Sequence, residues 1–245
     1  MTTFLTEIGE TLRWYRDKKH GPLPPILVSM TLVTGLVDAF SYLVLGHVFV
    51  ANMTGNVVLL GFALVGAPGF SIGSSLVAIG AFVLGGLAGG EIGTRFGSRR
   101  GRHLGSAAAV QVVFLTTGMI LAILSDKPVP AGYRYGLIVV LAIGMGIQNA
   151  TARKLAVPDL TTTVLTLTIT GIAADSTVVG GAGSKSGRRL VAVATMLAGA
   201  VVGAAFVVHH QVVLPLLTAV VVTPIVSVLA GVLGHSNPPW SRVEK

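Results

Sequence analysis

Residues 39–90 read AFSYLVLGHVFVANMTGNVVLLGFALVGAPGFSIGSSLVAIGAFVLGGLAGG, and this stretch of 52 residues contains no Asp, Glu, Lys or Arg. A second uncharged stretch of the same length covers residues 190–241. A transmembrane helix needs about 20 mostly apolar residues, so each stretch can hold more than one spanning helix. The pattern predicts an integral membrane protein.

The composition of the whole chain points the same way. Of its 245 residues, 52% are hydrophobic and only 11% are charged, whereas about 25% of residues are charged in soluble domains. This shortage of charge excludes a soluble enzyme, a nucleic-acid-binding domain and a disordered chain. We interpret the net charge of +8 as a mark of loops that stay in the cytoplasm, not as a sign of a nucleic acid partner.

The first 25 residues form a separate element. Apolar residues at helical spacing (Phe4, Leu5, Ile8, Leu12 and Tyr15) are interleaved with and followed by basic ones, up to a break at Gly21–Pro25. This pattern predicts a cytoplasmic amphipathic helix lying on the membrane surface; the alternative is a partly ordered tail. A second cytoplasmic tail is predicted at 237–245.

The region 26–236 is predicted to be a single all-α, polytopic membrane domain. Its apolar runs are too long and too uniform for strands. They divide into eight segments, near residues 26–46, 48–66, 73–94, 105–124, 135–154, 159–180, 190–208 and 212–233.

Three short matches suggest an internal repeat. Gly35–Ala39 matches Gly146–Ala150 at an offset of 111, and Ala51–Asn56 resembles Pro158–Thr163 at an offset of 107. A Gly-xxx-Gly pair repeats at an offset of 114, as Gly85 with Gly89 and as Gly199 with Gly203. Duplication would give a repeat at 26–124 and another at 135–233; chance similarity in a chain rich in Gly, Ala and Val is the alternative.

The positions of the basic residues favour six spans over eight. If every segment crosses, only eleven of the 17 basic residues lie on one side; if segments 48–66 and 159–180 enter and leave by the same side, fifteen do. Cytoplasmic loops carry an excess of Lys and Arg. We therefore predict a multi-pass inner-membrane protein with six spans, both termini cytoplasmic, and the second repeat inverted relative to the first.

Polar residues within the apolar segments are the candidate site. Asp38 lies inside the first segment, where a carboxyl group is costly and often functional, so it is a candidate proton or cation site; the alternative is a residue that fastens two helices. Its counterpart in the second repeat is Asn149. The two interrupted segments add the candidate solute-binding residues Asn52, Thr54, Asn56, Asp159, Thr161 and Thr163; the alternative is that these are ordinary helix caps.

Other patterns carry less functional information. The glycine-rich faces predict close helix packing, with an oligomer interface as a further option, and Glu91 is expected to pair with Arg95. Thr162, Thr166 and Thr170 are expected on one helix face. His209-His210 lacks a third ligand for a metal. We identify no catalytic set and no cofactor site, so an enzyme is not expected.

The run GLVDAFSYLVLGHVFVANMTGN at Gly35–Asn56 resembles the signature of YoaK-type bacterial membrane proteins, a family classed as a domain of unknown function. GIQNA at Gly146–Ala150 and PDLTTT at Pro158–Thr163 are similar to the family's second block. The resemblance covers roughly residues 26–233 and implies a small inner-membrane protein with about six spans. It implies no activity, substrate or catalytic residue.

The leading functional hypothesis is a secondary transporter or exporter of a small solute. The polar residues would form a site at the repeat interface, and Asp38 would couple proton movement to rocking of the repeats. The competing hypothesis is a structural or regulatory membrane protein whose polar residues only pack helices. The sequence specifies neither the solute nor the direction of movement.

Overall fold

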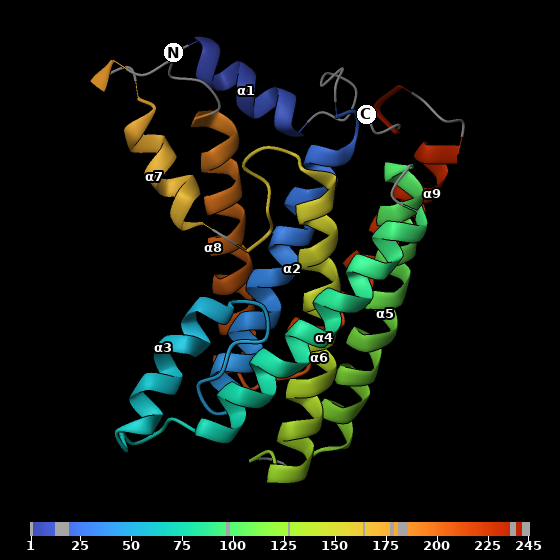
Figure 1. Cartoon of the computed structure of the whole chain (residues 1–245). Coiled ribbons are helices and arrows are strands. Elements are labelled where there is room, and N and C mark those ends of the chain that lie inside the picture. The colour runs from blue at the N-terminus through green and yellow to red at the C-terminus, as the bar shows by residue number, and fades with distance from the viewer. Residues whose placement is uncertain are drawn as a thin grey trace.

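The computed structural model describes residues 2–12, 20–96, 99–126, 128–163, 165–176, 179–180, 186–235 and 239–241. The described helices are α1 (Thr2–Leu12), α2 (Leu23–Val44), α3 (Met53–Leu64), α4 (Ile72–Phe96), α5 (Arg100–Leu124), α6 (Ala131–Leu155), α7 (Thr166–Ala174), α8 (Ser186–Val208), α9 (Leu214–His235) and a single 3-10 turn, η2 (Pro239–Ser241). Figure 1 shows their arrangement. The predicted basic stretch after α1, at Arg13, Arg16, Lys18 and Lys19, lies outside the described residues.

Six of these helices are long and apolar enough to cross a membrane, namely α2, α4, α5, α6, α8 and α9. They contain 22 to 25 residues each, which corresponds to lengths of about 33–38 Å against a hydrocarbon core of about 30 Å. The all-α polytopic fold with six spans is therefore confirmed. Pro24 and Pro25 stand in the first turn of α2, where proline is tolerated because its missing N–H would have no intrahelical partner.

The two remaining apolar segments are shorter as helices than the sequence predicted. The segment 48–66 forms only the 12-residue α3, and the segment 159–180 forms only the nine-residue α7. At about 18 Å and about 14 Å, neither can cross the hydrocarbon core. Left-handed backbone at Gly46 and His47 precedes α3, and left-handed backbone at Ala156, Asp159 and Thr162 precedes α7, so the chain turns back before each short helix begins.

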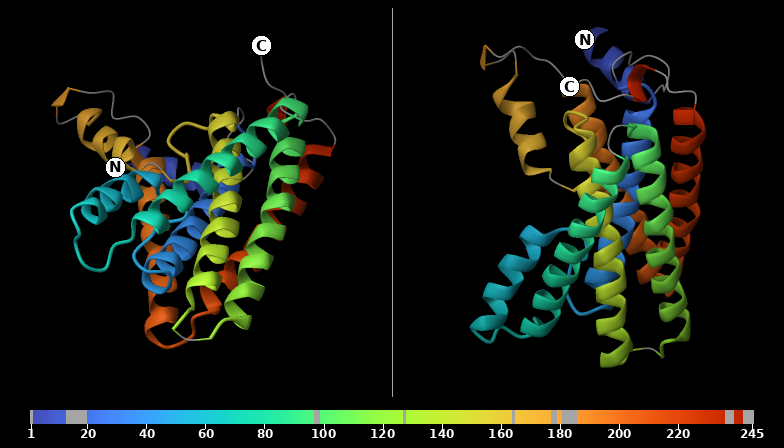
Figure 2. Two further views of the ribbon diagram at one scale, coloured as in Figure 1. Left: turned by 60° about the horizontal axis from the view of Figure 1, so that its bottom comes forward. Right: turned by 45° about the vertical axis from the view of Figure 1, so that its right-hand side comes forward.

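Figures 1 and 2 show where the two short helices lie. α3 descends to the end of the molecule from which α4 starts, and α7 rises to the opposite end, from which α8 starts. Each is therefore re-entrant, and the two enter from opposite ends. We call residues 45–52, which lead into α3, the first strap, and residues 156–163, which lead toward α7, the second strap.

α2 and α6 are the central helices. Within its most apolar window, 72% of α2 and 61% of α6 is buried inside the protein, against 17–33% for the other four long helices. α8 packs along α2, α4 packs along α6, and α5 packs along α9. The outer helices carry large exposed apolar side chains such as Leu87, Val113, Leu197 and Val228, which suits contact with lipid.

Glycines bring these helix backbones into direct contact. A Cβ at Gly35 of α2 would collide with the carbonyl oxygen of Met196 on α8, and a Cβ at Gly146 of α6 would collide with that of Phe82 on α4. The reciprocal contacts hold too: Gly199 faces the backbone of Leu32, and Gly85 faces that of Ile143. The predicted packing role of the small-residue faces is confirmed, and it is intramolecular, with Gly85, Gly89, Gly93, Gly199 and Gly203 all buried. An oligomer through other glycines stays a prediction.

The arginines are distributed unevenly between the two ends of the molecule. At the end of the molecule where α2 begins and α9 finishes, the terminal turns of other helices carry Arg95, Arg99, Arg102, Arg153 and Arg189. Arg134 lies in the first turn of α6, at the opposite end (Figure 2). The expected pair of Arg95 with Glu91 is present at 2.8 Å, on the surface. α1 lies across the first of these two ends, against α8.

Candidate functional site

A pocket of about 640 Å³ lies where the two re-entrant segments meet. We call it the central pocket. The first strap and α3 contribute Asn52, Met53, Thr54 and Gly55 to its lining, and α6, the second strap and α7 contribute Asn149, Thr163, Thr166 and Ile169. Tyr42, Phe49, Phe82 and Met196 supply large side chains from the strap and the surrounding helices. Four of the eight predicted site residues, Asn52, Thr54, Asn149 and Thr163, are therefore brought together.

Both short helices point their amino-terminal ends at the central pocket. The first intrahelical hydrogen bonds run from Asn56 N–H to Asn52 O in α3 and from Ile169 N–H to Leu165 O in α7. The preceding N–H groups have no partner within their helix, and neither Asn52 nor Leu165 provides a side-chain cap. The pocket therefore presents backbone donors from two directions.

Asp38 fastens the first strap. Its Oδ1 accepts hydrogen bonds from the backbone N–H of Val50 at 3.1 Å and of Ala51 at 2.9 Å. Its Oδ2 is buried and has no partner among the described residues. Asp38 thus holds the strap and does not line the central pocket. Its bonds fasten α2 to a strap, whereas the alternative left open by the sequence was a residue that fastens two helices.

Asn56 holds the same strap from α3. Its side chain accepts from the N–H of Phe49 at 2.9 Å and donates to the carbonyl oxygen of Phe49 at 2.6 Å. The ring of Phe49 stacks on Tyr42, with centroids 4.8 Å apart. Asn56 is fully buried and does not line the pocket, so its contacts are those of a fastening residue.

Asn149 of α6 fastens the second strap through a side-chain hydrogen bond. Its Nδ2 donates to Oγ1 of Thr163 at 2.5 Å, which ties α6 to the second strap. Both residues also line the central pocket. The pair therefore combines strap fastening with a surface that a solute can reach.

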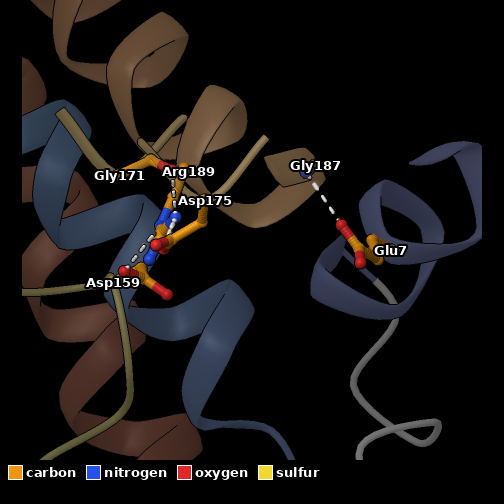
Figure 3. Close-up of polar contacts among 6 residues, drawn as sticks. All are labelled: Glu7, Asp159, Gly171, Asp175, Gly187 and Arg189. Atoms are coloured by element: carbon orange, nitrogen blue, oxygen red, sulfur yellow. Dashed lines mark hydrogen bonds and ion pairs between the residues drawn. The ribbon is translucent and has the colours of Figure 1, made fainter. Parts of the chain in front are cut away.

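The other predicted residues of the second strap lie elsewhere. Asp159 accepts from Nε of Arg189 at 3.0 Å, and the same guanidinium reaches Asp175 at 2.6 Å and the carbonyl oxygen of Gly171 at 2.5 Å. Figure 3 shows this cluster, in which one side chain of α8 holds the strap, the middle of α7 and its end. Thr161 is exposed.

The prediction that Thr162, Thr166 and Thr170 share one helix face in the segment 159–180 was wrong. Thr162 lies in the second strap, before α7 begins, so it shares no helix face with Thr166 and Thr170. Thr168 is the buried residue of α7. The helical spacing of the threonines does not hold here, because the backbone at Thr162 is left-handed and interrupts the helix.

Sequence reasoning missed three polar residues, namely Arg189, Gln148 and Gln111. Arg189 was considered only as a topological charge, although its side chain is 12% exposed and carries two ion pairs. Gln148, beside Asn149, donates to Thr34 Oγ1 at 2.8 Å and accepts from Gln111 at 2.6 Å, entirely inside the bundle. A polar residue inside an apolar helix was the available signal for both glutamines.

A second pocket, of about 540 Å³, adjoins the central one. It shares Phe82 and Asn149 with the central pocket and continues along the glycines of α4 and α6 to Arg153 and Lys154. Those two side chains are exposed. The two pockets together connect the middle of the bundle with the end at which the arginines gather.

Comparison with known proteins gives a family and no solved structure. A family model described as "Protein of unknown function (DUF1275)" matches residues 26–229. The chain is 35% identical over 155 residues to the UPF0700 transmembrane protein YoaK of Bacillus subtilis (strain 168), and the alignment covers 61% of this chain and 65% of that protein. No solved structure matches. The family model spans nearly the whole membrane domain, and the chain therefore belongs to the DUF1275 family, to which its resemblance to YoaK-type proteins pointed.

Proposed function

We propose that this protein is a secondary transporter or exporter of a small polar solute, with the central pocket as its binding site. The observation that carries the proposal is the convergence of two re-entrant helices, from opposite ends, on one pocket of about 640 Å³. Non-helical backbone at membrane depth is tolerated where it is buried or lines a water-filled cavity. Interrupted helices at corresponding places of two repeats are typical of transporter sites.

We infer that the chain arose by duplication with inversion. The contacts of Gly35 and Gly146 support this, since their partners Met196 and Phe82 differ by the same offset of 114 residues that relates Gly199 to Gly85. α2 and α6, which begin the two repeats, run in opposite directions (Figure 1). We place both termini in the cytoplasm, because the end that carries most arginines is then the inner one.

The lining of the central pocket favours a solute with hydrogen-bond acceptors. Backbone N–H groups from the first turns of α3 and α7 and the side chains of Asn52, Asn149 and Thr163 surround it, with no Asp, Glu, Lys or Arg among its lining residues. Phe82 and Met196 provide apolar contact. A small molecule with one polar and one apolar side fits this surface.

Within this proposal, α7 is the gate that separates the central pocket from the cytoplasm. Only Thr168 of α7 is buried, so little apolar packing holds the helix in place. Arg189 holds it instead, at Gly171 and at Asp175, and also holds the strap before it at Asp159. The strap before it contains three non-glycine residues with left-handed backbone, Ala156, Asp159 and Thr162, and such conformations cost energy that favours release.

Asp38 is the residue through which a proton would be coupled to transport. Its Oδ1 is used by the first strap, while Oδ2 is buried without a partner among the described residues. Burial disfavours a charged carboxylate, so a proton on Oδ2 would neutralise the group without breaking the strap's hydrogen bonds. Loading and loss of that proton would change the electrostatics next to the amino-terminal end of α3.

The test begins with purified protein in detergent, screened for thermal stabilisation by small polar solutes. A stabilising solute is then used in proteoliposome uptake, with Asn149→Ala and Thr163→Val as pocket variants. Thr117→Val is the matched control, because Thr117 is an exposed threonine of α5 that bonds only its own helix. We expect uptake to fall at least about tenfold in the pocket variants, as when about 1.4 kcal/mol of binding is lost, and to persist in the control. Equal uptake in all three would contradict the proposal.

The competing function, a structural or regulatory membrane protein, has its own support. The side-chain hydrogen bonds described above for Asp38, Asn56 and Gln148 all connect helices to straps or to other helices. If the pocket variants change stability but no solute is bound or moved, this second function gains.

A further inference from the structure

A groove of about 670 Å³ lies between the start of α5 and the end of α9, and it shares no lining residue with the central pocket. We call it the basic groove. Arg99, Arg102 and Ser106 line one side of it, and Ser227 and His235 line the other. It lies at the end of the molecule where α2 begins and α9 finishes. No residue of the proposed transport site takes part in it.

Among the described residues, no acidic side chain balances the charge of the basic groove. No Asp or Glu lines the groove, and neither Arg99 nor Arg102 forms an ion pair within the part of the chain that the structure describes. The guanidinium of Arg102 lies 5.7 Å from the centre of the Phe96 ring, a contact that positions the cation without neutralising it.

The start of α5 adds to the positive potential. Arg99 is its N-cap residue and makes no side-chain cap, and the first turn contains no acidic residue. The first intrahelical bond runs from His103 N–H to Arg99 O. The helix dipole therefore favours an anion at the same place as the two arginine side chains.

Below the charges, the groove becomes apolar. Its floor is made by Gly105 and Gly231, where α5 and α9 approach closely, and Ser227 Oγ donates to the carbonyl oxygen of Gly105 at 2.9 Å. Val113 of α5 and Val228 of α9 are exposed nearer the middle of the two helices, and Val232 is exposed beside the groove. A ligand that fits this surface has an anionic head next to long apolar chains.

We propose that the basic groove binds the headgroup phosphate of an anionic phospholipid, with the acyl chains along the outer faces of α5 and α9. The Arg99 and Arg102 guanidinium groups bind the phosphodiester oxygens, for which their planar donor geometry is suited. Ser106, one turn beyond Arg102 along α5, supplies a hydroxyl donor from the same lining. Basic pockets between helices at the cytoplasmic boundary bind anionic headgroups in this way.

The test is a native mass spectrometry titration of the full-length protein with phosphatidylglycerol and with phosphatidylcholine. We expect phosphatidylglycerol to bind at least about tenfold more tightly to the wild type, and we expect this preference to disappear in Arg99→Gln/Arg102→Gln. Arg95→Gln is the matched control, because Arg95 is an exposed arginine at the same end that lies outside the groove. It should keep the preference.

A second variant separates the groove from charge alone. A Cβ at Gly231 meets no atom within 4 Å, so a side chain can start from this lining position, and Gly231→Leu narrows the groove while both arginines stay in place. It should also abolish tight lipid binding. Retained preference in Gly231→Leu, or equal binding of the two lipids by the wild type, overturns the proposal. Displacement of the lipid by millimolar inorganic phosphate would show a site for free phosphate and would overturn the assignment to a lipid.

Discussion

The carboxyl group of Asp38 accepts a hydrogen bond from the backbone N–H of Ala51 at 2.9 Å, so a residue inside α2 fixes the strap that leads into α3. A second bond, from Val50 at 3.1 Å, goes to the same oxygen. Because only Oδ1 is used, the fastening role and the proposed proton role of Asp38 belong to different atoms. The two roles can therefore be separated by mutation.

Asp38→Asn keeps a carbonyl oxygen for the strap but removes the titratable group. We expect this variant to fold as stably as the wild type, and to transport solute without response to a pH gradient. Asp38→Ala removes the acceptor for two buried N–H groups and should lower the free energy of unfolding by about 2–3 kcal/mol. Denaturation in mixed micelles and pH-gradient-driven uptake are the measurements. Unchanged pH dependence in Asp38→Asn would refute proton coupling through this residue.

Replacing Arg189 should release α7. Arg189→Ala leaves Asp159 and Asp175 without their ion-pair partner, and we expect a loss of about 2 kcal/mol of local stability. The chain has no cysteine, so Thr168→Cys, at a buried position of α7, can report exposure by its maleimide labelling rate. That rate should rise several-fold in Arg189→Ala. Arg95→Ala, which breaks an exposed pair, should leave the labelling rate unchanged. An equal rate with and without Arg189→Ala would contradict the role of Arg189 in holding α7.

The glycine seam between α4 and α6 should not accept a methyl group. A Cβ at Gly85 would collide with the backbone of Ile143, whereas a Cβ at Gly80 on the same helix meets no atom within 4 Å. We expect Gly85→Ala to lower the free energy of unfolding by about 3 kcal/mol through forced separation of the helices. Gly80→Ala should be neutral or slightly stabilising. Similar stability of the two variants would mean that the seam is looser than described.

The buried glutamine pair should show strong coupling. Gln148→Leu leaves Gln111 and Thr34 without their partner and should cost about 2 kcal/mol. The double variant Gln111→Leu/Gln148→Leu removes both polar groups and should recover part of that loss. A double-mutant cycle measures the coupling, and additive effects would contradict a shared network.

The orientation in the membrane can be tested with single cysteines. In intact cells, an impermeant maleimide should label Pro68→Cys, between α3 and α4, and should reach Arg99→Cys only after permeabilisation. The expectation rests on the gathering of basic residues at the end that carries Arg99. External labelling at Arg99 would reverse the proposed topology.

The sequence by itself determined that this is a helical membrane protein with six spans. Two uncharged stretches required several spanning helices, and the positions of Arg95, Arg153 and Arg189 favoured two segments that do not cross. These inferences depend on the length of the apolar stretches and on the positions of the charges, and both can be read along the chain without knowing which residues are in contact. For the same reason, the starts of the two interrupted segments could be named as a site, and Asn52, Thr54, Asn149 and Thr163 do line one pocket.

Only the tertiary structure decided what each polar residue does. Asp38 and Asn56 face the backbone of a strap, Asp159 faces Arg189, and Asn149 faces both a strap and the pocket. Some hydrogen-bond partners, such as Thr34 and Gln148, are more than a hundred residues apart in the sequence. Their contact depends on how α2 and α6 are placed side by side. Left-handed turns at Ala156 and Thr162 set where α7 begins. Such contacts arise from packing in three dimensions, and hydropathy along the chain does not encode them.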